Sequence, residues 1–177
     1  MRHDAIDVFK TGIYAITPDI NDLNRLILMV EQALSGGVRL FQYRNKVSAP
    51  DQRRLVAQRL NDIIESSGGS LIINDDPKLA KVVNARGVHI GKEDAALEIA
   101  RDILGPSKII GVSCYDNLPM ALDMQSRGAD YLAFGAFFPS LSKSTATPVS
   151  IDILRLARTS GIKIPIVAIG GVTLNNA

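Results

Sequence analysis

Short apolar runs alternate with amphipathic helical patterns along the whole chain, and this alternation restricts the fold more than any other feature of the sequence. The runs predict strands at residues 12–17, 40–44, 71–74, 87–90, 108–113, 131–135 and 164–170. Helices are predicted between them, at about 22–35, 50–66, 76–84, 95–104, 117–127 and 150–160. Residues 164–169 are apolar almost throughout, which is typical of a strand buried on both faces of a parallel sheet. The chain is therefore predicted to be α/β, as an open doubly wound sheet or a closed barrel.

Polar residues recur where the predicted strands end, and this favours the barrel. Gln42 and Arg44 close the second strand, Asn74 and Asp75 the third, and Ser113 the fifth. A TIM barrel assembles its active site at this end of its strands. A glycine-rich phosphate loop, which would favour a doubly wound fold, does not follow the first strand. We therefore predict a (β/α)8 TIM barrel formed by one domain, residues 1–177.

Only seven strands can be counted, and residues 173–177 have the pattern of a helix start. A closed barrel of this type needs an eighth strand. We therefore expect the domain to be C-terminally incomplete, and the natural protein to be longer by a helix, a strand and a final helix, on the order of 30 residues.

Composition and charge exclude several classes of function. The net charge is only +2 and the basic residues are scattered, so a nucleic-acid partner is not expected. The apolar runs are too short for a membrane span, which needs about 18 residues, and the N-terminus lacks the apolar core of a signal peptide. The only cysteine, Cys114, is expected to be a buried filler, and a single cysteine is consistent with the reducing cytoplasm. The sequence is compatible with a homo-oligomer but does not determine the oligomeric state.

The second strand ends in candidate anion ligands. Period-2 alternation puts Gln42 and Arg44 on one side of the strand, and Lys46 follows in the loop. The guanidinium of an arginine and the ammonium of a lysine together suit an oxyanion such as a phosphate. The alternative interpretation is a solvated strand end that carries surface cations.

Acidic residues follow the third and fourth strands, and Asp75 and Asp94 are candidate magnesium ligands because Mg²⁺ prefers oxygen. The alternative is that these acids stabilise helix N-termini, and Asp76, directly before Pro77, is expected to be such an N-cap. His89, inside a strand, is interpreted as a packed core histidine rather than a catalyst.

Two loops complete the set of candidates. Ser140, Ser142 and Lys143 follow the sixth strand, and a loop with hydroxyls and a lysine can close over a phosphate. The alternative is a solvated linker. Gly171 follows the seventh strand, where backbone amides can approach a ligand closely.

Taken in order, these segments resemble the thiamine phosphate synthase family. The matching stretches are QYRNK (42–46), IINDD (72–76), GVHIGKED (87–94), GVS (111–113), GADYLAFGAFFPSLSK (128–143) and VAIGGVTLNNA (167–177). The resemblance implies a Mg²⁺-dependent transferase of thiamine biosynthesis. Such an enzyme joins hydroxymethylpyrimidine pyrophosphate to thiazole phosphate and releases pyrophosphate, so small-molecule substrates are the expected partners.

The resemblance also implies roles for individual residues. Gln42 matches a contact in the pyrimidine pocket, and Asp75 and Asp94 match the magnesium ligands. Gly171 matches a backbone contact to the thiazole phosphate, and Ser140 and Ser142 stand where the family usually has threonines that hold it. The residues that match pyrophosphate or pyrimidine contacts are Arg44, Lys46, Asn74, Ser113 and Lys143; of these, Arg44, Lys46, Ser113 and Lys143 are expected to act in catalysis.

Related thiazole tautomerases share much of this pattern but place a histidine where this sequence has Tyr115. That difference and the paired acids favour the synthase. The alternatives kept open are a tautomerase-like enzyme, a non-catalytic phospholigand-binding barrel, and another phosphate-handling barrel such as an isomerase or epimerase.

Overall fold

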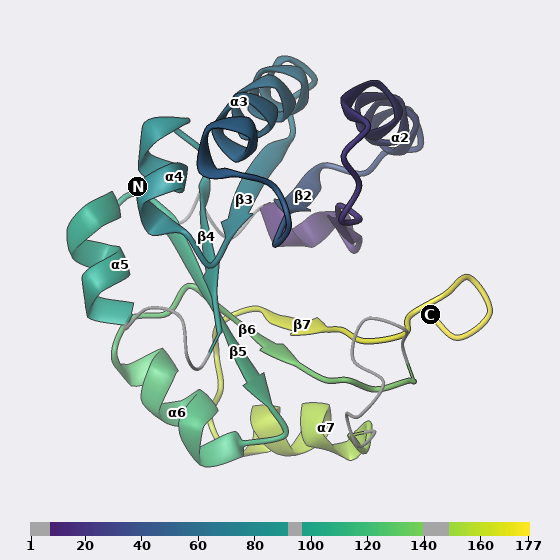
Figure 1. Cartoon of the computed structure of the whole chain (residues 1–177). Coiled ribbons are helices and arrows are strands. Elements are labelled where there is room, and N and C mark those ends of the chain that lie inside the picture. Colours follow the sequence, from purple (N-terminus) through teal and green to yellow (C-terminus); the bar gives the residue numbers. More distant parts are fainter. Residues whose placement is uncertain (1–7, 92–96, 140–148) are drawn as a thin grey trace.

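The computed structural model describes residues 8–91, 97–139 and 149–177. Seven parallel strands form one sheet in chain order, β1 to β7, and helices α2 to α7 lie around its outside (Figure 1). The strands are β1 (Tyr14–Ile16), β2 (Leu40–Tyr43), β3 (Ser70–Asn74), β4 (Gly87–Ile90), β5 (Ile109–Tyr115), β6 (Tyr131–Phe134) and β7 (Ile166–Ala168). The helices are α2 (Leu23–Ser35), α3 (Pro50–Ser66), α4 (Pro77–Val82), α5 (Leu97–Leu104), α6 (Leu118–Ser126) and α7 (Asp152–Thr159). The predicted barrel architecture is confirmed, with seven strands in the described part of the chain.

Alternation along the strands separates two apolar regions. One side of each strand packs against the helices in a large core that includes Phe41, Ile73 and Leu132. The other side points into the barrel, where Leu40, Ile72, Ile109 and Tyr131 form a smaller buried cluster. Every residue of β2, β4 and β6 is buried, as expected for a parallel sheet covered on both faces. The prediction of such burial for residues 164–169 is wrong, because β7 is an edge strand of the described sheet and its residues are half-buried or exposed.

The ends of several elements differ from prediction. The first strand was expected from residue 12, but a short 3-10 helix, η1 (Val8–Thr11), and Gly12 at φ 80° precede it, so β1 begins at Tyr14. The sequence pattern did not indicate η1, whose Phe9 packs against Tyr131 with ring centroids 4.7 Å apart. β5 runs to Tyr115, past a register shift against β6, and is therefore longer than expected.

The buried face of α3 excludes Leu55. The helical spacing of residues 50–66 allows Leu55 to share an apolar face with Val56 and Leu60, but its side chain is 58% exposed. Leu55 lies about 100° from Val56 on the side opposite to Ala57, so its side chain falls outside the buried stripe of the helix. Ala57 and Asn61 occupy the buried face instead.

Two local predictions are confirmed. The Asp76 side chain accepts a hydrogen bond from the Leu79 amide at 2.8 Å, which makes it the N-cap of α4, with Pro77 in the first turn. Cys114 is fully buried on the helix side of β5. Within the described residues, no helix combines the length and apolarity needed to cross a bilayer.

Candidate active site at the carboxyl ends of the strands

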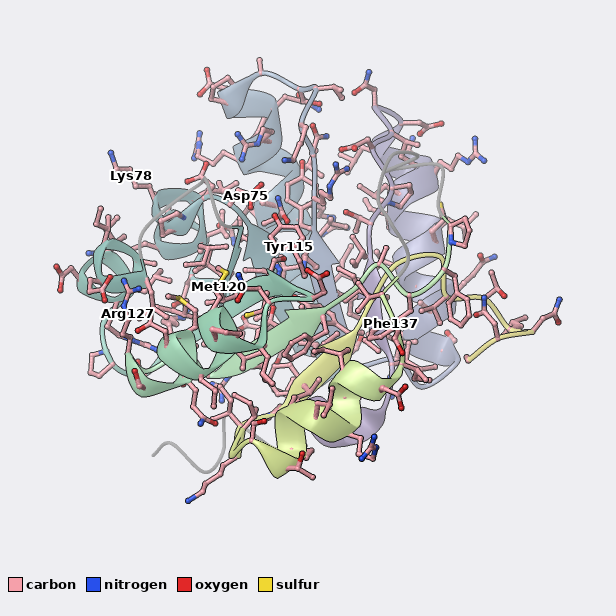
Figure 2. All side chains as sticks on the ribbon, turned by 90° about the horizontal axis from the view of Figure 1, so that it is seen from below. Asp75, Lys78, Tyr115, Met120, Arg127 and Phe137 are labelled. Atoms are coloured by element: carbon pink, nitrogen blue, oxygen red, sulfur yellow. The ribbon has the colours of Figure 1, made fainter. Side chains whose placement is uncertain are left out.

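The predicted polar residues meet at one end of the barrel because all its strands run in the same direction. Gln42 lies in β2, Asn74 at the end of β3 and Ser113 in β5, and Asp75 directly follows β3. Figure 2 labels Asp75 and Tyr115, which mark the carboxyl ends of β3 and β5. The alternation of β2 turns Gln42 away from the helix-facing core residues Phe41 and Tyr43 and toward the barrel interior.

Asp75 is the centre of a small polar assembly. Its Oδ2 lies 3.2 Å from Lys46 Nζ and accepts a hydrogen bond of 2.5 Å from the Asn74 side-chain amide. The Asp75 backbone has φ 63°, in the left-handed region that few residues other than glycine, asparagine and aspartate adopt. Left-handed backbone in non-glycine residues is often found at functional sites. The structure thus brings together three of the predicted site residues.

Arg44 has a carboxylate partner, Asp19, that was not predicted from the sequence. Asp19 Oδ2 forms an ion pair with Arg44 Nη1, and Asp19 Oδ1 accepts a hydrogen bond from the Lys46 backbone amide at 3.1 Å. Asp19 lies in the loop after β1, at the same end of the barrel as the predicted residues. The sequence could have indicated Asp19, because it lies two residues after Thr17, at the end of the first predicted strand. Asn74 and Asp75 occupy the corresponding place at the end of the third strand.

Five side chains form a continuous line of hydrogen bonds across the barrel interior. Gln42 Nε2 donates to the Tyr14 hydroxyl at 3.0 Å, and this hydroxyl lies 3.0 Å from that of Tyr131. His89 Nδ1 lies 2.8 Å from the Tyr131 hydroxyl, and His89 Nε2 lies 2.8 Å from Ser113 Oγ. His89 is only 5% exposed, so the expected burial is confirmed. The line connects two predicted site residues, Gln42 and Ser113.

Burial keeps the two tyrosines of this line protonated. Removal from water raises the pKa of both Tyr14 and Tyr131 above the ordinary tyrosine value, because the phenolate would lose its hydration. Each hydroxyl therefore retains its hydrogen at neutral pH and can donate one hydrogen bond.

Gly171 lies in a turn after β7 that excludes a side chain. Its φ is 63°, and a Cβ atom at this position would come within 2.7 Å of the Phe138 carbonyl oxygen. Only glycine fits such a close backbone approach without displacing the neighbouring chain.

Four predicted site residues lie outside the described residues: Asp94, Ser140, Ser142 and Lys143. The described ranges contain no group of three or more histidine, cysteine or acidic side chains that could hold a metal ion. Asp75 is therefore the predicted metal ligand whose surroundings the structure describes.

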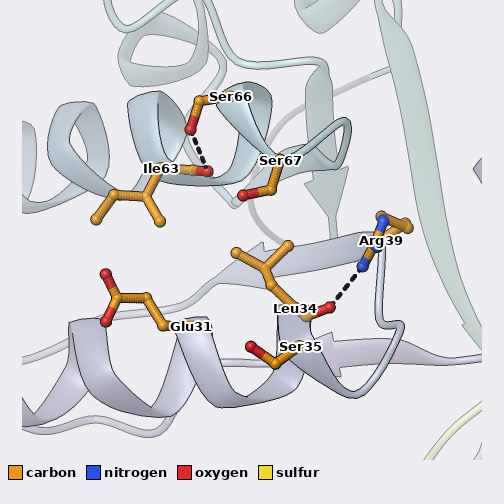
Figure 3. Close-up of a pocket in the computed structure, with 7 residues that line it drawn as sticks. All are labelled: Glu31, Leu34, Ser35, Arg39, Ile63, Ser66 and Ser67. Atoms are coloured by element: carbon orange, nitrogen blue, oxygen red, sulfur yellow. Dashed lines mark hydrogen bonds between the residues drawn. The ribbon is translucent and has the colours of Figure 1, made fainter.

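A separate hollow of ≈ 420 Å³ lies between the C-terminal ends of α2 and α3, away from the site (Figure 3). Its one guanidinium, on Arg39, already donates to the carbonyl oxygens of Leu34 at 2.7 Å and Val38 at 2.8 Å. Glu31 lines the same hollow, and helix C-termini carry partial negative charge, so an anion is disfavoured there.

Comparison with known proteins agrees with this geometry. A family described as thiamine monophosphate synthase matches residues 13–177. Thiamine-phosphate synthase of Nitrosospira multiformis is 48% identical over 94% of this chain and 71% of the relative, and that of Methylobacillus flagellatus is 49% identical over 94% and 78%. The solved thiamine phosphate pyrophosphorylase of Pyrococcus furiosus superposes with a TM-score of 0.82 at 32% identity, covering 96% of this chain and 79% of that one. The chain belongs to the thiamine monophosphate synthase family.

Proposed function

We propose that this chain catalyses the joining of hydroxymethylpyrimidine pyrophosphate to thiazole phosphate, which yields thiamine phosphate and pyrophosphate. The observation that carries the proposal is the assembly of Lys46, Asp75 and Asn74 at the carboxyl end of the barrel, in a chain 48% identical to a thiamine-phosphate synthase. A cation beside a carboxylate and an amide suits a pyrophosphate together with a divalent metal ion.

In the proposed reaction, the bond between the pyrimidine methylene carbon and pyrophosphate breaks, and its electron pair leaves with the pyrophosphate. The thiazole nitrogen then donates its lone pair to the methylene carbon. Arg44, Lys46 and Lys143 would stabilise the negative charge that grows on the leaving group. The reaction requires positioning and electrostatics rather than a side-chain nucleophile.

The remaining residues would bind the two substrates. Gln42, Asn74 and Ser113 are proposed to contact the pyrimidine or its pyrophosphate, and Ser140, Ser142 and the Gly171 backbone to hold the thiazole phosphate. The exclusion of a side chain at Gly171 supports this last role, because backbone amides then stay accessible to an oxyanion.

Asp75 and Asp94 are the proposed ligands of Mg²⁺. The fit is tested at Asp75, an oxygen ligand whose side chain is 22% accessible and lies beside the lysine proposed to bind pyrophosphate. Mg²⁺ usually takes one or two carboxylates and completes its shell with substrate phosphates and water, so a third acidic ligand is not needed. When bound, the ion would supply positive charge to the leaving pyrophosphate.

The finer biological assignments also stay proposals. A cytoplasmic location is supported by the single cysteine, which lies buried on the helix side of β5. The synthase is preferred to a tautomerase-like enzyme or a non-catalytic barrel because the relatives compared above are described as synthases or pyrophosphorylases.

The decisive experiment mixes the protein with both heterocyclic phosphates and Mg²⁺ and quantifies thiamine phosphate by chromatography. Asp75→Asn should lower kcat on the order of 10²-fold, the size expected for a lost contact to developing charge. Asp76→Asn is the matched control, because the amide oxygen can still cap α4, and it should stay within about twofold of wild type.

A binding measurement complements the assay. Calorimetry should show pyrophosphate binding to wild type that weakens sharply when Mg²⁺ is chelated. Equal activity of Asp75→Asn and wild type, or chelator-insensitive pyrophosphate binding, would refute the assignment of Asp75 to the metal.

A further inference from the structure

The hydrogen-bond line through the barrel interior has a direction that the participating groups determine. Each tyrosine hydroxyl has one hydrogen to donate, and a neutral histidine has one N–H and one acceptor nitrogen. Gln42 presents its amide nitrogen, a donor only, to the Tyr14 oxygen. The Tyr14 hydrogen is then free to point at the Tyr131 oxygen, and the Tyr131 hydrogen at His89 Nδ1.

This direction determines which nitrogen of His89 carries the proton and how His89 bonds to Ser113. Because His89 Nδ1 accepts from Tyr131, the proton of the neutral imidazole sits on Nε2 and is donated to Ser113 Oγ. Ser113 Oγ has then received a hydrogen bond, and its own hydrogen is available to a further acceptor. In the opposite direction, Tyr131 would donate to Tyr14, the Tyr14 hydrogen would find no acceptor within the line because Gln42 presents a donor there, and Ser113 would spend its hydrogen on His89.

The line is built to hold its geometry. Gln42 is 4% exposed and Tyr131 is fully buried, so neither can exchange its partner for water. The ring of Tyr131 packs against Phe9 at 4.7 Å and the His89 ring at 5.5 Å between centroids. Buried networks in which every hydrogen finds an acceptor specify one orientation of their members.

We propose that Tyr14, Tyr131 and His89 are positioning residues that form a one-way hydrogen-bond relay from Gln42 to Ser113. The relay holds His89 as the Nε2–H tautomer and turns the Ser113 hydroxyl hydrogen toward the substrate oxyanion. The part that concerns substrate rests on the proposed function, in which Gln42 and Ser113 contact the pyrimidine pyrophosphate. The relay connects Gln42 in β2, proposed to recognise the heterocycle, with Ser113 in β5, proposed to stabilise the leaving group. These two strands are not neighbours in the sheet.

The tautomer of His89 can be measured without any activity. The chain has two histidines, so protein labelled with 15N-histidine gives two sets of ring signals, and His3→Gln assigns them. At pH 8, well above the ordinary histidine pKa of about 6.5, we expect the His89 Nε2–H tautomer in wild type. A mixed or Nδ1–H tautomer in wild type would overturn the relay. Tyr131→Phe, which removes the donor to Nδ1, should lower the share of the Nε2–H tautomer relative to wild type.

The kinetic test uses Tyr43→Phe as the matched control, since Tyr43 is a second buried tyrosine whose ring packs in the helix-side core. Tyr131→Phe should lower kcat about tenfold with a smaller change in KM, because the Ser113 donor is misdirected rather than removed. Tyr14→Phe, which leaves the bond between Tyr131 and His89, should have a smaller effect on the tautomer. Tyr43→Phe should change neither tautomer nor kcat.

The two proposals can fail separately. If wild-type His89 is the Nε2–H tautomer and Tyr131→Phe disturbs it, but no thiamine phosphate forms, the relay is supported and the proposed function is refuted. If thiamine phosphate forms and the Tyr131→Phe enzyme keeps the wild-type kcat and tautomer, the relay is refuted and the proposed function is supported.

Discussion

Substitution of Gly111 by alanine tests the packing that holds the barrel interior together. Gly111 lies in β5, and the ring of Tyr131 from β6 lies directly over its α-carbon. A Cβ atom at Gly111 would overlap Cζ, Cε1 and Oη of that ring. The ring cannot move aside freely, because it is fully buried, packs against Phe9, and its hydroxyl is hydrogen-bonded to Tyr14 and His89.

The expected loss can be built from these contacts. Overpacking a close-packed core costs about 1–3 kcal/mol. If Tyr131 shifts, two hydrogen bonds weaken, at about 1 kcal/mol each. We therefore expect Gly111→Ala to lower the free energy of unfolding by about 3–5 kcal/mol, and Tm by about 6–20 °C for a domain of this size. Urea denaturation followed by circular dichroism measures the first quantity, and calorimetry the second.

Two controls decide whether the Tyr131 ring is responsible. Gly128→Ala meets open space and suffers only from its φ of 94°, so it should cost about 1–2 kcal/mol. Tyr131→Leu removes the overlapping atoms, so Gly111→Ala should cost clearly less in that background than in wild type. Additive losses in the double variant would refute the reasoning.

Two further predictions concern residues outside the site. Asp130 Oδ2 accepts hydrogen bonds from Arg101 Nη2 at 2.6 Å and from the Ile110 amide at 2.8 Å, so Asp130→Asn should lower the free energy of unfolding in urea by about 2 kcal/mol. Asp123→Asn, in an exposed ion pair, should lower it by about 0.5 kcal/mol or less. Equal losses in the two variants would contradict this prediction. Burial raises the pKa of the Cys114 thiol to about 12, so a thiol reagent at pH 8 should label one cysteine in denaturant and none in the native protein. Burial disfavours the thiolate of the native protein, so Cys114 contributes its full stabilisation at pH values below the unfolded thiol pKa of about 8.5. This contribution to the free energy of unfolding should fall as the pH rises from there toward 12. A native thiol that reacts at pH 8 would refute the assigned burial.

Local patterns in the sequence were sufficient for the elements and for the face of the barrel that carries the site. Apolar runs and helical spacing predicted each strand and helix of the sheet order, and Asp76 before Pro77 predicted the start of α4. These features depend on residues a few positions apart, whose interactions are the same in any fold. The parallel direction of the strands then followed from their burial, and it places all their carboxyl ends together.

Contacts between distant segments could not be obtained in this way. Period 2 puts Gln42 and Arg44 on one side of their strand, but it does not indicate which side chains of other strands they touch. That depends on the register between strands and on the curvature of the sheet, which brings Tyr14 within 3.0 Å of Tyr131 across 117 positions of sequence. The same holds for the pairing of Lys46 with Asp75. Sequence periodicity therefore determined the scaffold and the chemical types available at the site. The register between strands and the curvature of the sheet determined which of those groups share a hydrogen bond or a charge, because only the tertiary structure sets the distances between residues of different strands.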